Sequence, residues 1–132
     1  MASFLQFMLP GAPSIYYADE AGMEGYKDPF NRRTYPWGNE NQVLLAHFRQ
    51  LGQMRKTIPA LRLGNIDFFC NSAGRIGFSR CYQGKKYRIY CNRSAENWDI
   101  PAGKLLFSSN LRAAAPNWLT LGENGFCILE DE

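Results

Sequence analysis

The sequence has little of what marks a metal site, a membrane span or a nucleic-acid surface. It contains one histidine, and its four cysteines include no C-x-x-C pair, so the ligand spacing of a zinc site is missing. No apolar run approaches the ~20 residues that cross a bilayer. The net charge is only +3, and basic pairs such as Arg55-Lys56 are interpreted as solvated surface charge. We therefore expect no metal, no cofactor, no membrane and no nucleic acid as a partner.

The chain of 132 residues is long enough for a domain with its own core. It is too short for a closed eight-stranded α/β barrel, which needs about 250 residues. The cysteines lie in apolar, strand-like runs and are interpreted as small buried hydrophobic residues; they are Cys70, Cys81, Cys91 and Cys127. Free cysteines are typical of a reducing compartment, and residues 1–9 lack the basic region and cleavage site of a signal peptide. These features predict a cytoplasmic location.

The first part of the chain alternates between helix, strand and loop signals. Residues 2–9 are apolar at helical density and stop at Pro10-Gly11, which predicts the end of a helix. Residues 13–17 form a short apolar run, which predicts a strand buried on both faces of a parallel sheet. Residues 22–38 are rich in glycine and proline and predict a loop.

A second helix should follow this loop. Asn39 is the expected N-cap, with Gln42 as its reciprocal partner three residues later. Apolar residues then recur at helical spacing up to Pro59, namely Val43, Leu44, Phe48, Leu51, Met54 and Ile58. Strand, loop and helix together make one βα unit.

From about residue 62 the hydrophobic period changes from helix to strand. Apolar or alternating runs at 66–70, 76–82 and 87–91 are separated by turn signals at 71–74 and 83–86. Further apolar stretches follow near residues 100, 104–107, 118–121 and 126–129. Short strands at roughly ten-residue spacing predict an antiparallel β domain over residues 62–132.

Two motifs before the β domain resemble the α-amylase family of glycoside hydrolases (family 13). The run from Pro10 to Met23, with Ile15-Tyr16-Tyr17 and Asp19-Glu20, is similar to the segment that contains the eighth barrel strand. The run from Lys27 to Trp37 is similar to the following loop in the neopullulanase, cyclomaltodextrinase and maltogenic amylase branch. One departure is Ala18, where the family usually has glycine. Other stretches also fit, namely Arg55–Leu61, Ile76–Arg80 and Tyr90–Ser94.

The resemblance implies an α/β part followed by an all-β part. Residues 1–61 would be the terminal fragment of a catalytic (β/α)8 TIM barrel: the end of the seventh helix, the eighth strand, its loop and the eighth helix. Residues 62–132 would be a C-terminal antiparallel β-sandwich. The family carries its catalytic aspartate nucleophile, acid/base glutamate and stabilising aspartate on earlier strands, and none of those motifs occurs here. We therefore expect a fragment with no catalytic residue of its own.

The expected parent is an α-glucan hydrolase that cleaves α-1,4, and in one alternative also α-1,6, glucosidic bonds with retention of configuration. Its partner would be an α-glucan, a maltooligosaccharide or a cyclodextrin. The resemblance implies that Asp28 and Arg32 contact glucose hydroxyls, since a carboxylate accepts and a guanidinium donates hydrogen bonds. The alternative is an ion pair that only holds the loop. Tyr17 and Trp37 are candidates for stacking on sugar rings, with loop packing as the alternative.

Asp19 and Glu20 are the obvious carboxylate pair to consider for catalysis. A retaining glycosidase needs two carboxyl groups about 5–5.5 Å apart across the scissile bond. Adjacent residues at a strand end point to opposite faces, so we do not expect this pair to flank one sugar, and we interpret both residues as structural. A small independent enzyme built on them is the least favoured reading.

A second reading makes the β domain a non-catalytic carbohydrate-binding or interaction module. It requires exposed, coplanar aromatic side chains after residue 62, where Trp98 and Trp118 are the main candidates. His47 is interpreted as a residue at the boundary of the apolar stripe. Asn92-Arg93-Ser94, although a glycosylation sequon in a secreted protein, is interpreted as a turn.

Overall fold

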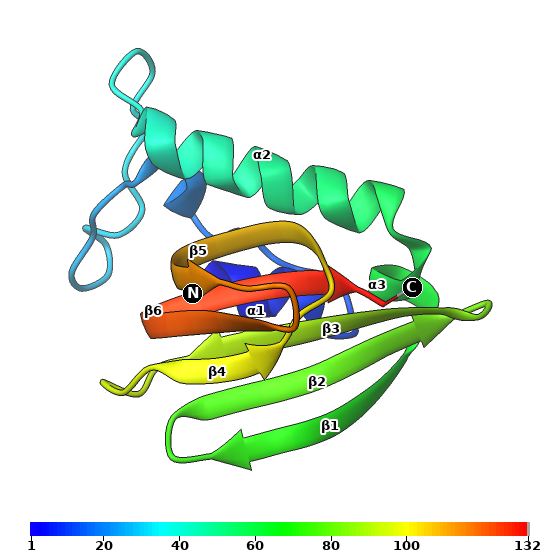
Figure 1. The fold of residues 1–132 in the computed structure, drawn as a ribbon. Coiled ribbons are helices and arrows are strands. Elements are labelled where there is room, and N and C mark those ends of the chain that lie inside the picture. The colour runs from blue at the N-terminus through cyan, green and yellow to red at the C-terminus, as the bar shows by residue number, and fades with distance from the viewer. Residues whose placement is uncertain (132) are drawn as a thin grey trace.

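The computed structural model describes residues 1–131 as four helical elements, of which the third is the longest, followed by an antiparallel sheet (Figure 1). The helical elements are α1 (Ala2–Met8), the 3-10 helix η1 (Asp19–Ala21), α2 (Gln42–Thr57) and α3 (Pro59–Leu63). The strands are β1 (Asn65–Ser72), β2 (Arg75–Tyr82), β3 (Lys85–Asn92), β4 (Trp98–Pro101), β5 (Lys104–Ala114) and β6 (Trp118–Glu130).

Helix α2 begins two residues later than the sequence pattern predicts. Its N-cap is Asn41, whose side-chain oxygen accepts hydrogen bonds from the backbone N–H groups of Val43 and Leu44, both at 3.1 Å. Gln42 bonds instead to the carbonyl of Glu40 at 3.3 Å. The prediction of Asn39 as the cap was wrong because Asn41 is held in place from outside the helix, where its own N–H donates to the carbonyl of Ala21 at 2.8 Å.

Residues 13–17 do not form the predicted strand. No strand pairs with them within residues 1–131, and Ile15, Tyr16 and Tyr17 are exposed. A strand of a parallel sheet requires hydrogen bonds to its neighbours, so an apolar run without them has no reason to hold strand geometry. The predicted burial on both faces fails for the same reason.

The β domain is antiparallel, as predicted, and its first two turns lie where the sequence placed them. The strand order is β1-β2-β3-β6-β4, and β5 pairs with β6 as well. Ala73-Gly74 and Gln83-Gly84 connect the first two hairpins, and all four residues have positive φ. Two-residue loops of this type match the twist of the strands that they join.

The predicted β-sandwich needs correction, because the described strands are hydrogen-bonded into one sheet. The long strand β6 makes this possible. Its first residues pair with β4, its last residues pair with β3, and β5 pairs with it along both parts. Three register shifts between β5 and β6 let the sheet bend, so that one continuous sheet buries side chains on both of its faces.

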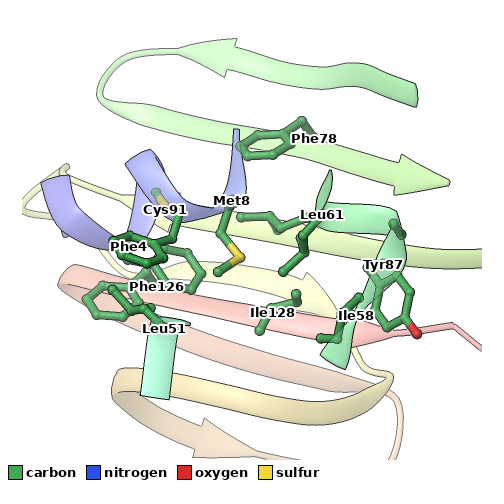
Figure 2. Close-up of a cluster of buried hydrophobic side chains, with 13 residues drawn as sticks. Phe4, Met8, Leu51, Ile58, Leu61, Phe78, Tyr87, Cys91, Phe126 and Ile128 are labelled. Carbon is green, nitrogen blue, oxygen red and sulfur yellow. The ribbon is translucent and has the colours of Figure 1, made fainter. Parts of the chain in front are cut away.

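Alternate residues of the central strands enter two different cores. Phe78, Ile89 and Ile128 face the helices and pack with residues of α1, α2 and α3 (Figure 2). Tyr90 and Leu129 point to the other face, where a smaller core also contains Ile100, Leu119, Leu121 and Cys127. The helices before residue 62 and the sheet after it therefore share one hydrophobic core.

Two of the four cysteines are buried, as predicted. Cys91 and Cys127 lie in the sheet, and burial raises the pKa of each thiol to about 12. Cys70 is half-buried and Cys81 is exposed, so the prediction was wrong for Cys81. Cys81 lies one residue before the end of β2, on the face opposite to the buried Arg80, whereas Ser79 on its own face is still buried. Its exposure therefore follows from its place at the end of the strand.

Arg55 also differs from its prediction as surface charge, because its side chain is buried within the last turn of α2. Its guanidinium donates to the carbonyls of Phe7 at 2.5 Å and Leu9 at 3.1 Å, and to that of Gly11. An arginine and a lysine at adjacent helix positions face different directions, so Lys56 stays exposed while Arg55 turns inward.

Candidate functional site

The candidate site lies in the loop between η1 and α2. The N–H of Asn41 closes this loop on the carbonyl of Ala21. Inside it, Gly25 lies so close to the backbone of Asn31 that no side chain would fit at that position. The loop is thus folded back on itself, and it brings residues 28–32 near Tyr16 and Tyr17.

Asp28 and Arg32 form an ion pair at the surface of the loop. One guanidinium nitrogen of Arg32 donates to a carboxylate oxygen of Asp28 at 2.5 Å. This hydrogen bond raises the pKa of Arg32. The side chains are 49% and 58% exposed for Arg32 and Asp28. The pair therefore has the geometry of a loop-internal ion pair, while about half of each side chain is open to a ligand.

Tyr17 lies beside this pair. It is close enough to Arg32 to contribute, after Asp28, to the raised pKa of that arginine, and its ring meets that of Tyr16 edge-on at a centroid distance of 4.6 Å. Asn31 extends the group, since its amide donates to the hydroxyl of Tyr16 at 3.3 Å. The structure thus brings together three of the four residues expected to bind substrate: Tyr17, Asp28 and Arg32.

The backbone bends sharply directly after Tyr17. Tyr17 and Ala18 have φ angles of 30° and 61°, in the left-handed region. Glycine adopts this region without a penalty, and alanine pays a steric cost there. This geometry gives a physical reason for a glycine in place of Ala18 in the resembled family.

Trp37, the fourth expected residue, lies in a separate aromatic pair. Its side chain is 80% exposed, and its ring lies 4.5 Å from that of Tyr35. Desolvation, followed by the negative charges of Glu20 and Glu40, raises the pKa of Tyr35. Tyr35 lies within the run from Lys27 to Trp37, and its contact with Trp37 makes it the nearest ring to that exposed side chain.

Asp19 and Glu20 lie in the 3-10 helix η1 and not at a strand end as predicted. The two residues follow each other in one helical turn, so the expectation of opposite strand faces does not apply. Oε2 of Glu20 is buried without a hydrogen-bond partner, whereas Asp19 is exposed. Within residues 1–131 no group of three or more acidic, histidine or cysteine side chains could hold a metal ion.

The row of three aromatic residues around Tyr90 in the β domain does not form a flat platform. Phe69, Tyr90 and Trp98 follow one another at centroid distances of 5.2 and 5.4 Å, but their planes are inclined by 56° and 74°. Tyr90, in the middle, is buried in the smaller core. A row of inclined rings with a buried centre cannot stack along consecutive sugars, so the geometry disfavours the binding-module reading.

His47 and Asn92 have structural surroundings. The ring of His47 is hydrogen-bonded to the hydroxyl of Ser3 at 3.0 Å, and burial lowers its pKa. Asn92 is fully buried, and its amide donates to the carbonyls of Glu96, Leu121 and Gly122. Its side-chain oxygen accepts a hydrogen bond from the backbone N–H of Ser94, which confirms the predicted turn. The side-chain nitrogen of Asn92, the atom that glycosylation would modify, is occupied by the three carbonyls.

Similarity to known proteins connects this loop and sheet to a family of enzymes. The chain is 41% identical over 80 residues to an amylopullulanase of Thermoanaerobacter thermohydrosulfuricus, covering 61% of this chain and 5% of that protein. It is 35% identical over 100 residues to a cyclomaltodextrinase of Geobacillus thermopakistaniensis, covering 73% of this chain and 17% of that protein. No family model matches the sequence.

The fold agrees with these relatives. A crystal structure of the debranching enzyme from Nostoc punctiforme superposes with a TM-score of 0.81 at 32% identity, over 97% of this chain and 30% of that one. The chain belongs to the α-amylase family of glycoside hydrolases. The chain spans less than a third of the length of each of these three proteins. No helix within residues 1–131 is long and apolar enough to cross a membrane.

Proposed function

We propose that this chain is a C-terminal part of an α-glucan hydrolase and contributes a substrate-binding loop to it. Residues 1–61 would complete a (β/α)8 barrel, and residues 62–132 would form the domain that follows. The exposed apolar residues 15–17 support this role, because a strand between two barrel neighbours would cover them. The coverage of only 5% to 30% of the three relatives points the same way.

The observation that carries the binding role is the exposed group of Asp28, Arg32 and Tyr17. It offers a carboxylate acceptor, a planar donor and an aromatic ring within one loop. Vicinal sugar hydroxyls both donate and accept, so a carboxylate and a guanidinium side by side suit one glucose unit. In this proposal Trp37 supplies a separate stacking surface near the same loop.

The chain by itself would bind an α-glucan without cleaving it. A retaining mechanism needs an acid/base and a nucleophile on either side of the bond. Asp28 is committed to Arg32, and Glu20 has an oxygen buried within the protein, so neither supplies a free carboxylate for this chemistry. The parent would hydrolyse α-1,4 or α-1,6 bonds with carboxylates from the rest of the barrel.

Calorimetric titration of the chain with maltotetraose and with β-cyclodextrin tests the binding role. Asp28→Asn removes the charge of the acceptor, and Arg32→Lys keeps the charge but removes the planar fork of donors. Each variant should weaken binding about tenfold, since one hydrogen bond to a charged group is worth about 1.5 kcal/mol. Asp67→Asn, an exposed carboxylate on β1, is the matched control and should leave the affinity unchanged.

Two further outcomes decide the rest of the proposal. Release of reducing ends from pullulan by the purified chain would contradict its lack of catalysis. Equal affinity of the wild-type chain, Asp28→Asn and Arg32→Lys would refute the binding role. The intact mass of the protein in its source distinguishes a 15.1 kDa chain from a piece of a longer enzyme.

A further inference from the structure

Two buried arginines hold the turn from which the binding loop departs. Arg80 on β2 is fully buried, and Arg55 at the end of α2 is 8% exposed. The hydrogen bonds that their side chains make among the described residues all run to backbone carbonyls. Burial of a guanidinium is costly unless its N–H groups are satisfied, so such an arrangement ties separate parts of the backbone together.

Arg80 joins the end of α1 to the start of the sheet. It donates to the carbonyl of Met8 at 2.7 Å, to that of Gly64 at 2.9 Å and to that of Asn65 at 3.2 Å. The last carbonyls of a helix have no partner within the helix, and Arg80 provides one for Met8. The β domain thereby fixes the position at which α1 ends.

Arg55 holds the next residues along the chain. It donates to the carbonyls of Phe7 and Leu9 and also to that of Gly11, beyond the helix end. Gly11 has a φ of 99°, so the chain bends here in a conformation that favours glycine. The direction in which the chain leaves toward Tyr17 is therefore set at this turn.

The other end of the loop is attached to the same helix. Asn41 caps α2 and binds the carbonyl of Ala21. Arg55 lies at the opposite end of α2, whose 16 residues form a rigid rod. Between these two attachments, the side chain of Gln6 adds a hydrogen bond to the carbonyl of Ser14 at 2.6 Å.

From this arrangement we infer that Arg80 and Arg55 are positioning residues for the sugar-binding loop. They hold the Pro10-Gly11 turn in place relative to the β domain. The turn in turn fixes where Tyr17 and the Asp28–Arg32 pair lie. The inference rests on the binding role proposed above for that pair. It assigns the β domain a part in substrate recognition without any contact between that domain and the sugar.

The test compares Arg80→Lys and Arg55→Lys with Arg88→Met. Arg88 on β3 also donates to backbone carbonyls, those of Pro101 and Ala102, but it makes no contact with α1 in the described structure. For each variant three quantities are measured: the affinity for maltotetraose, the urea midpoint, and the backbone amide NMR shifts of residues 11–17. A lysine keeps the charge and loses the fork of donors, which makes unfolding less severe than loss of the whole side chain.

We expect both lysine variants to weaken maltotetraose binding at least fivefold and to shift the amide signals of residues 11–17. Arg88→Met should lower the urea midpoint and change the affinity less than twofold. Affinity that falls in step with the midpoint in all three variants, or unshifted signals in both lysine variants, would overturn the inference.

Failure of the inference can be told apart from failure of the binding role. If the wild-type chain does not bind maltotetraose, the binding role fails. The amide shifts of residues 11–17 in the two lysine variants then test by themselves whether the arginines position the loop. If Arg80→Lys does not fold, Arg55→Lys decides, because Arg55 contacts the turn itself.

Discussion

The loop of residues 12–40 and the core between helices and sheet are held by different forces. In the core, residues such as Phe78 and Ile89 are fully buried, and the period-2 pattern of the strands places them there. In the loop, Tyr16 and Trp37 are largely exposed, and hydrogen bonds and one ion pair keep the chain in shape. Apolar burial thus stabilises the scaffold, while the polar loop stays accessible for binding.

The largest difference between the two regions should appear on removing one aromatic side chain from each. Phe78→Ala empties a fully buried site that faces the helices, and it should lower the free energy of unfolding by about 3–5 kcal/mol. Phe30→Ala in the exposed loop should change it by less than about 0.5 kcal/mol. Urea denaturation of both variants makes the comparison, and a similar loss in both would show that the loop belongs to the core.

A smaller effect is expected where the loop meets α2. Asn41→Ala removes both cap hydrogen bonds and should cost about 1 kcal/mol in unfolding free energy. Asn39→Ala is the control, since Asn39 caps nothing in α2 and should have almost no effect. A larger loss from Asn39→Ala than from Asn41→Ala would restore the cap position that the sequence pattern suggested.

The smallest effect concerns His47, which lies on α2 with its ring 5.9 Å from that of Phe107 on β5. Burial lowers its pKa below 6.5, so the folded state favours the neutral ring and the unfolded state binds a proton more readily. Its contribution is therefore present above pH 6.5 and is lost as the pH falls through the folded-state pKa. Urea midpoints between pH 8 and pH 5 should fall less in His47→Gln than in the wild-type chain, and identical pH profiles would contradict this role.

The sequence predicted those parts of the fold that depend on local patterns. The helix end at Pro10-Gly11, the helix before Pro59 and the first two hairpins were correctly placed, because proline, glycine and hydrophobic period act over a few residues. The strand at residues 13–17 was wrong because its stability depends on neighbours that the local pattern does not contain.

For the candidate site, the sequence pointed to Asp28, Arg32 and Tyr17 by resemblance, and the structure shows that Asp28 and Arg32 form an ion pair with Tyr17 nearby. Sequence reasoning missed the importance of Arg80 and Arg55, since an arginine in a strand or at a helix end looks like surface charge. The one sequence signal for them is that both lie in stretches that resemble the α-amylase family, Arg55–Leu61 and Ile76–Arg80.

By itself, the sequence determined the antiparallel β domain, the helices that precede it and the membership of the α-amylase family. Only the tertiary structure decided that the strands form one bent sheet, that Asn41 caps α2 and that two arginines are buried. The physical reason is the distance along the chain over which each interaction acts. Hydrophobic period and turn chemistry are properties of a few adjacent residues, whereas the burial of a charge depends on carbonyl groups brought together from distant parts of the chain.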